Sequence, residues 1–286
     1  MIQSLKRVNI ARYGAAIVLF VMLVLNVCIT PNFFSIQTLW NVLIQAFPVI
    51  LMSLGMTLVI ATGGIDISVG STMALSSIIF AKIAIQMEGN FYFALLLALL
   101  AAALFGMFNG VLVGVFKLQP IVSTLILMVS GRGIAQLVND GVVISFYGNE
   151  YAKLGLYRIG GVVPVQVLMI LVAVIFMSLI FKKTTFGCYV QAVGDNSRTA
   201  RLTGVQSTMV IIAVYVICAL LAGFAASFET LRLCSADPNN IGNNIELDCV
   251  AAVAVGGTNM SGGKAHILGT VIGALVMQLV TIMVNM

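Results

Sequence analysis

The chain alternates between long apolar runs and short polar links. No charged residue occurs in residues 13–65, 89–116, 159–181 or 202–228. A helix needs about 20 consecutive apolar residues to cross a bilayer, so the first of these runs holds two such helices. Strands of membrane β-barrels instead alternate in polarity over segments of about ten residues. The continuous runs therefore predict transmembrane α-helices.

Charged residues, prolines and glycines divide the chain into apolar segments. The segments cover residues 13–30, 39–62, 66–86, 91–116, 120–138, 162–181, 209–229, 247–256 and 266–285. The penultimate segment is too short to cross alone, so we expect a re-entrant or discontinuous helix there. The predicted fold is all-α: a polytopic transmembrane helical bundle with discontinuous helices and about nine membrane segments, forming one domain over residues 1–286.

Composition supports lipid as the solvent of this chain. Hydrophobic residues make up 61% and charged residues 8%, with a mean hydropathy of +1.13. A soluble domain carries about 25% charged residues. The net charge of +5 is scattered between apolar segments, which does not indicate nucleic-acid binding. The five cysteines are odd in number and form no CxxC motif, so we interpret them as apolar packing residues.

Lysine and arginine positions predict the orientation. If the N-terminus is cytoplasmic, alternation of the segments places most of the basic residues on the cytoplasmic side, where such residues are enriched. These are Lys6, Arg7, Arg12, Lys117, Lys182, Lys183, Arg198, Arg201 and Lys264, against Lys82, Lys153, Arg158 and Arg232 on the outer side. We therefore expect a cytoplasmic N-terminus and an outward-facing 139–161 loop.

The polar loop 182–208 is then cytoplasmic and has a helical core. Asn196 or Ser197 can cap a helix, residues 198–202 suit one, and Gly204 can end it. This pattern predicts a short amphipathic helix below the membrane. A simple solvated connection is the alternative, given the length of the loop.

Two glycine-rich segments resemble each other. Residues 63–70 read GGIDISVG and residues 256–263 read GGTNMSGG, and each lies between apolar runs. Paired glycine interruptions of this kind indicate a transport site at broken helices, although one short echo is weak support for internal duplication. In the first segment, Asp66 at bilayer depth costs about 2.5–3.5 kcal/mol, which predicts a wet or protein-buried position. Alternatively, Asp66 and Ser68 cap a helix near the interface.

Three further features are weighed between packing and transport. Glycines 106, 110 and 114 form a stripe of small residues that favours close helix packing. Asn109 beside that stripe either joins helices or touches a solute. Arg132 lies between uncharged stretches, and should pair, extend to an interface or line a wet path. Further along, residues 235–263 combine turn residues, Glu246 and Asp248 with a half-length apolar piece, which favours a discontinuous helix over a plain loop.

No catalytic set is visible in the sequence. His266 is the only histidine, and no GK[ST] phosphate-binding loop is present. The sequence predicts no cofactor and no metal site. If transport is driven by ATP, another polypeptide must hydrolyse it.

The same segments resemble the permease subunits of the ribose-type branch of bacterial ABC sugar importers. The motifs GMTLVIATGGIDISVGS, QPIVSTLILMVSGRGIAQL, AVGDNSRTARLTGV and ADPNNIGNNIELDCVAAVAVGGTNMSGG occur in family order from about residue 40 onward. The second and fourth look closest to galactofuranose-type members. The resemblance implies a bacterial inner-membrane protein with a second permease chain, cytoplasmic ABC ATPase subunits and a periplasmic sugar-binding protein as partners.

The resemblance and the residue patterns together give two sets of candidate site residues. The candidate translocation path comprises Gly63, Gly64, Asp66, Ser68, Asn109, Arg132, Gln136, Asn259 and Ser261. The loop that the resemblance implies for coupling to the ATPase comprises Gly194, Asp195, Asn196, Arg198, Arg201 and Gly204.

One departure from the family concerns the C-terminus. Family members continue with a further helix and a basic tail, so the resemblance implies that this chain lacks the last C-terminal helix. A secondary transporter or channel, with Asp66 carrying a coupled ion, is the alternative function. An intramembrane enzyme is disfavoured because no catalytic cluster is visible.

Overall fold

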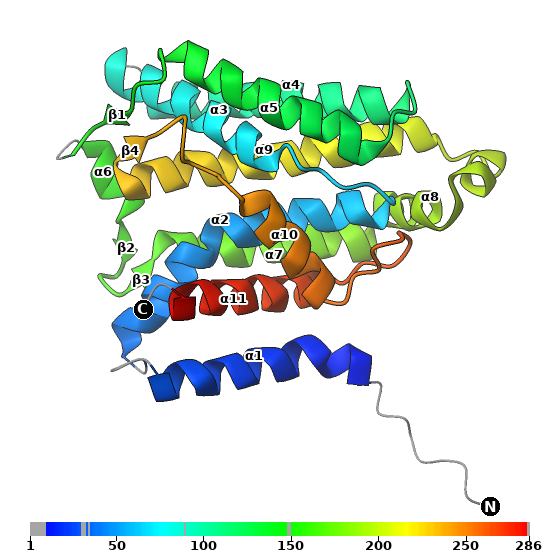
Figure 1. Cartoon of the computed structure of the whole chain (residues 1–286), viewed down its shortest axis with the longest axis horizontal. Helices are drawn as coiled ribbons and strands as arrows, with labels where there is room; N and C mark the ends of the chain where they lie inside the picture. Colours follow the sequence, from blue (N-terminus) through cyan, green and yellow to red (C-terminus); the bar gives the residue numbers. More distant parts are fainter. Residues whose placement is uncertain (1–9, 30–32, 34, 89, 148–149, 285–286) are drawn as a thin grey trace, which may run out of the picture.

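The computed structural model describes residues 10–29, 33, 35–88, 90–147 and 150–284. Lys6 and Arg7, which contribute to the predicted orientation, lie outside these residues. The helices are α1 (Ile10–Ile29), α2 (Ile36–Ala61), α3 (Val69–Ala81) with a π-helical extension η1 (Lys82–Gln86), α4 (Phe91–Gly114), α5 (Pro120–Val138), α6 (Glu150–Gly155), α7 (Val165–Lys183), α8 (Thr185–Leu202), α9 (Ser207–Leu233), α10 (Ile245–Val255) and α11 (Ile267–Val284). Most lie side by side along one direction, and α8 sits at one end of the bundle (Figure 1).

Four two-residue strands lie at the opposite end of the bundle (Figure 1). They are β1 (Ile144–Ser145), β2 (Arg158–Ile159), β3 (Val163–Pro164) and β4 (Ser235–Ala236). β1 pairs antiparallel with β4, and β2 pairs antiparallel with β3. The predicted 139–161 loop is thus partly ordered by short strands and α6, and β1 ties it to the end of α9.

Seven helices in the described part of the chain are long and apolar enough to cross a membrane. They are α2, α3 with η1, α4, α5, α7, α9 and α11. The predicted all-helical, multi-pass architecture is therefore confirmed, but the count of about nine segments is not. Two segments fall short by length: α10 has 11 residues, and the apolar part of α1 covers only residues 14–28.

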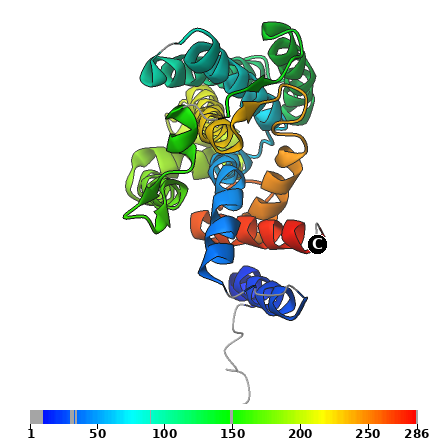
Figure 2. The same ribbon diagram turned by 90° about the vertical axis from the view of Figure 1, so that its left-hand side faces the viewer.

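Helix α2 forms the centre of the bundle. In its most apolar window, 83% of the residues are buried inside the protein. It packs against α7, α9, α10 and α11, and the end-on view shows it between these helices (Figure 2). Gly55 lets α9 approach, because a Cβ there would lie 2.7 Å from the Cα of Cys218. α2 therefore provides a fixed axis for the segments around it.

Helix α4 carries its small residues on the side that faces the protein and its large apolar residues on the outer side, as expected for a helix in contact with lipid. Small residues face inward, and the large residues Leu96, Leu100, Leu104 and Phe108 are about half exposed. Gly106 and Gly110 contact α9 closely: a Cβ at either position would lie 2.6 Å from the backbone of Tyr215 or Ile212. The packing interpretation of the glycine stripe is confirmed.

Two of the inward-lying helices are interrupted. Residues 62–68 leave the end of α2 beside α8 and return into the bundle before α3 begins at Val69 (Figure 1). Likewise, the chain runs from β4 at the far end into the middle of the bundle, where α10 begins at Ile245 (Figure 1). The predicted discontinuous segment near residues 247–256 thus corresponds to α10.

Candidate functional site: two junctions between broken helices

The first junction brings the starts of α3 and α10 together inside the bundle. A Cβ at Gly70 would overlap the carbonyl oxygen of Gly242, and one at Gly242 would lie 2.6 Å from the carbonyl oxygen of Gly70. Gly242 also has φ +71°, which favours glycine. The carboxylate of Glu246 lies against Gly70, in the first turn of α10. Two helix N-termini, each with a positive dipole end, therefore meet beside a carboxylate.

Asp66, Ser68 and Asn109 form a buried polar cluster next to this junction. Asp66 Oδ1 accepts hydrogen bonds from the backbone N–H (2.9 Å) and hydroxyl (2.6 Å) of Ser68. Asn109 Nδ2 donates to Ser68 Oγ at 2.7 Å, and Ser123 Oγ lies 3.5 Å from Asn109 Oδ1. Ser68 occupies the N-cap position of α3, but its side chain makes no capping bond. The cluster instead fixes the broken segment 62–68 to α4.

Gly63 and Gly64 are glycines for two different structural reasons. Gly63 adopts φ +82°, a left-handed conformation that lets the chain leave α2. A Cβ at Gly64 would lie 2.8 Å from the hydroxyl oxygen of Tyr215, so α9 passes close to the segment.

Arg132 and Gln136 do not join the Asp66 cluster; they hold the turn that precedes α10. Arg132 donates to the carbonyl oxygens of Ile241 (2.6 Å) and Pro238 (3.2 Å). Gln136 donates to Asn239 Oδ1 at 2.8 Å. These bonds fix the path of the chain from β4 into the bundle.

The turn itself is organised around Asp237. Burial opposes ionisation of this carboxyl, but hydrogen bonds from Asn240 and Asn239 outweigh that effect and lower its pKa. Asp237 therefore stays ionised at neutral pH and anchors the turn.

The second junction lies at the α8 end and joins three segments. The backbone N–H of Gly263 donates to the carbonyl oxygen of Ala61 at 2.9 Å. A Cβ at Gly194 of α8 would overlap that carbonyl oxygen and lie 2.5 Å from the nitrogen of Gly263. The carboxylate of Asp195 lies directly over Gly263. The end of α2, the middle of α8 and the α10–α11 link thus meet with no room for side chains.

Asn259 and Ser261 lie in the α10–α11 link and are exposed. Asn259 Oδ1 accepts from the backbone N–H of Ser261 at 3.1 Å, which closes a local turn. A Cβ at Gly63 would lie 4.0 Å from the carbonyl oxygen of Ser261. The two glycine-rich segments that resemble each other in sequence therefore lie side by side at this junction.

Helix α8 bends at Asn196, immediately after Gly194 and Asp195. Asn196 has φ −162° and ψ 102°, and its Oδ1 accepts from the N–H groups of Arg198 and Thr199 at 3.0 Å each. The predicted cap and short helix are confirmed, and Gly204 follows with φ +89°. The helical piece 185–195 before the bend was not predicted.

The short piece after the bend presents a basic surface. Arg198 and Arg201 are exposed, and Leu202 between them and Gly204 is 85% exposed. Lys117, in the α4–α5 link, lies near Arg201: partial burial lowers the pKa of Lys117, and the charge of Arg201 lowers it further.

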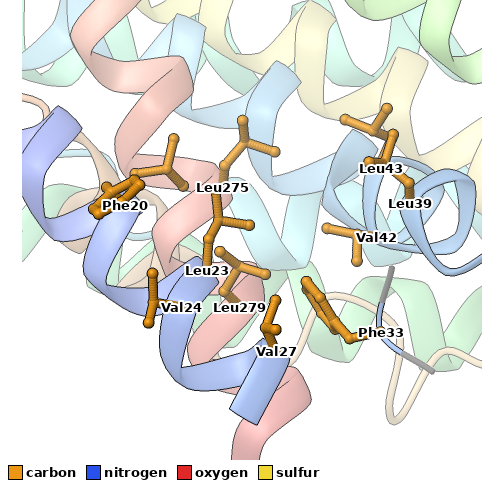
Figure 3. Close-up of a pocket in the computed structure, with 11 residues that line it drawn as sticks. Phe20, Leu23, Val24, Val27, Phe33, Leu39, Val42, Leu43, Leu275 and Leu279 are labelled. Carbon is orange, nitrogen blue, oxygen red and sulfur yellow. The ribbon is translucent and has the colours of Figure 1, made fainter. Parts of the chain in front are cut away.

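An apolar cavity of 680 Å³ lies elsewhere, between α1, α2 and α11. Hydrocarbon side chains such as Phe20, Leu23 and Leu275 surround it (Figure 3). They offer a polar solute no hydrogen bonds, so this cavity suits hydrocarbon chains of lipid. Among the residues with described positions, no group of three or more His, Cys, Asp or Glu side chains gathers as metal ligands do.

Broken helices that meet inside a membrane-spanning bundle are typical of polytopic transport permeases. Residues 38–286 match the family described as "Branched-chain amino acid transport system / permease component", and the chain belongs to this family. The family makes it a transport subunit and not an enzyme.

Three relatives of this chain have names that state what they transport. The chain is 39% identical over 238 residues to the galactofuranose transporter permease protein YtfT of Escherichia coli (strain K12), covering 83% of this chain and 69% of the relative. It is 38% identical over 264 residues to the ribose import permease protein RbsC of the same strain (91% and 82%). It is 33% identical over 234 residues to the fructose import permease protein FruF of Bifidobacterium longum (81% and 65%). No solved structure is a significant match. The resemblance drawn from the sequence motifs is confirmed.

Proposed function

We propose that this chain is the membrane-spanning permease subunit of an ATP-binding-cassette importer that carries a monosaccharide across a bacterial inner membrane. The observation that carries this proposal is the family match over residues 38–286, together with relatives named for ribose, galactofuranose and fructose import. Separate subunits hydrolyse ATP, since the sequence has no phosphate-binding loop.

The proposed orientation places the α8 end and the N-terminus in the cytoplasm. Basic residues favour that end, in line with the enrichment of Lys and Arg in cytoplasmic loops. They are Lys117, Lys182, Lys183, Arg198, Arg201 and Lys264. With α1 and α10 counted as membrane segments, the chain would cross or enter the membrane nine times within one permease domain, residues 1–286.

The proposed partners bind at opposite ends. The α8 piece after Asn196, with exposed Arg198 and Arg201, is the surface for a cytoplasmic ATPase subunit. A periplasmic sugar-binding protein would dock at the end that carries β1 to β4. A second permease chain, identical or related, would complete the path.

The second junction gives a physical route for coupling. A displacement of the 197–202 piece acts on Gly194 and Asp195, which touch both Ala61 at the end of α2 and Gly263 before α11. From there the broken segments 62–68 and α10 lead to the first junction. We propose that ATPase movement is transmitted along this route, and that Asp66, Ser68 and Asn109 border the translocation path with Gly63, Gly64, Asn259 and Ser261.

The test removes the charge of the docking surface. In an Arg198→Ala/Arg201→Ala double variant, we expect co-purification of the ATPase and sugar uptake both to fall by about tenfold, because two exposed cations that steer and orient the partner are lost. A Lys153→Ala/Arg158→Ala variant removes the same charge at the other end and should keep the co-purification of the ATPase. Equal retention in the two variants would refute the assignment of α8.

A secondary transporter is the second candidate, because Asp66 is a buried carboxylate 1% exposed. In that case Asp66→Asn would abolish uptake driven by an ion gradient without any ATPase present.

A further inference from the structure

A second cavity, of 290 Å³, lies beside the first junction and is lined by polar side chains. It is bounded by α2, the start of α3, the end of α9, the turn before α10 and α10 itself. Its polar lining residues are Gln45, Glu229, Asn240, Asn243 and Asp248. It shares Gly242 with the first junction and Asn240 and Ile241 with the turn before α10. None of the five polar residues is among the candidate path residues from the sequence.

The hydrogen-bonding capacity of this lining is only partly used. Within the described chain, no hydrogen bond or ion pair engages the Asp248 carboxylate. The side-chain oxygen of Gln45 accepts from Gln278 at 3.0 Å, which leaves the amide N–H groups of Gln45 as donors. Glu229, in contrast, is paired with Arg232, whose Nε lies 2.8 Å from Oε2. The cavity therefore offers a carboxyl acceptor, Asp248 of α10, and an amide donor, Gln45 of α2.

The charged residues that line the cavity determine which kind of solute can bind there. No lysine or arginine lines the cavity, and the nearby Arg232 is already paired with Glu229. A phosphate or a sugar acid would bring a further anionic group next to the carboxylate of Asp248 with no lysine or arginine in the lining to balance it, which is unfavourable. A neutral polyol would instead donate its hydroxyls to Asp248 and accept from Gln45. The apolar side chains of Pro48, Val49 and Met73 provide contact for C–H groups.

The size and position agree with this chemistry. The volume corresponds to about ten waters at roughly 30 Å³ each, which is room for a small polar solute. Substrate sites in transporters lie where discontinuous helices break, and Gly242 at the break lines the cavity.

We propose that this cavity is a monosaccharide-binding station of the translocation path, with Asp248 and Gln45 as the residues that hydrogen-bond the sugar. This inference rests on the proposed function and adds two things: the residues that contact the sugar, and a preference of the station for neutral monosaccharides over sugar acids and sugar phosphates.

The experiment uses the full permease reconstituted in liposomes with its ATPase and binding protein. Uptake of ribose, galactose and fructose, uptake of the sugar acid gluconate and basal ATP hydrolysis are measured for the wild type, Asp248→Asn and Gln45→Ala. We expect Asp248→Asn to lower sugar uptake tenfold or more, since a charge-assisted hydrogen bond is lost, while partner co-purification and basal hydrolysis stay within about twofold. Asp140→Asn makes the same chemical change outside the cavity and serves as the control for the loss of one negative charge.

The outcomes separate the two proposals. If the wild type shows no ATP-dependent uptake of any sugar, the proposed function fails. If the wild type imports sugar and Asp248→Asn imports it within twofold of the wild-type rate, the station is refuted and the proposed function stands. Gluconate uptake that equals the uptake of the neutral sugars would refute the specificity. Should Asp248→Asn fail to co-purify with the ATPase, Gln45→Ala decides by the same criteria.

Discussion

At the scale of single residues, the amide of Asn109 illustrates how polar groups act in a protein dissolved in lipid. Its neighbour Phe108 is 56% exposed, whereas Asn109 is 1% exposed and bonds Ser68 across 41 positions of the chain. Inside a membrane no water competes for such bonds, so the amide holds the broken segment to α4.

Asn109→Ala should therefore destabilise the protein by about 1–3 kcal/mol, because Ser68 Oγ loses its donor and Ser123 its acceptor in a buried place. The measurement is thermal unfolding in detergent. Phe108→Ala truncates a larger side chain on the same helix but faces lipid, so it should change the midpoint much less. A similar loss in both variants would contradict the role given to Asn109.

The sequence identified Asp66, Ser68 and Asn109 as separate candidates, and the structure brings them together. Their partnership was not predictable, because spacing within one helix reports which residues share a face but not which face of another helix they meet. Gly242 was missed for the same reason. In the sequence NNIGNN it looks like an ordinary turn glycine. Only its contact with Gly70 shows that a side chain at this position would also collide with the start of α3.

At the scale of elements, α8 depends on a glycine contact more than on its own helix propensity. Its central Gly194 fits against Ala61 and Gly263 with no space for a methyl group. Because backbone atoms form the obstacle, relaxation of a side chain cannot relieve it.

Gly194→Ala should push α8 away from α2 and uncouple it, which lowers uptake by about tenfold or more while the ATPase still hydrolyses ATP. Gly133→Ala is the matched control: nothing lies within 4 Å of a Cβ there, and alanine favours a helix by up to about 1 kcal/mol over glycine. Coupled uptake that survives Gly194→Ala unchanged would disprove transmission through this contact.

The two halves of α8 differ in how well sequence predicts them. The piece after Asn196 carries its own start and stop signals, so it was predictable. The 185–195 piece contains Phe186, Gly187 and Val190, which have modest helix propensity. Tertiary packing makes it helical: Val190 and Val193 are buried against the rest of the bundle.

At the scale of the whole molecule, the spanning helices follow almost directly from the apolar runs, because bilayer thickness fixes their length. Which helices pack against each other does not follow from these runs. α9 packs on α2, α3 and α4, yet its apolar residues cover every face. In lipid, both the buried and the exposed faces are apolar, so periodicity loses the information that it carries in soluble helices.

The proposed function requires that a separate cytoplasmic ATPase subunit drives the transport of a sugar through this helical bundle. Its most direct test is sugar uptake into liposomes that contain the permease and its ATPase, with binding protein outside and ATP on the ATPase side. We predict that uptake requires all three components, stops with vanadate and continues when proton and sodium gradients are dissipated. Uptake that proceeds without the ATPase, follows an ion gradient and disappears in Asp66→Asn would contradict the claim.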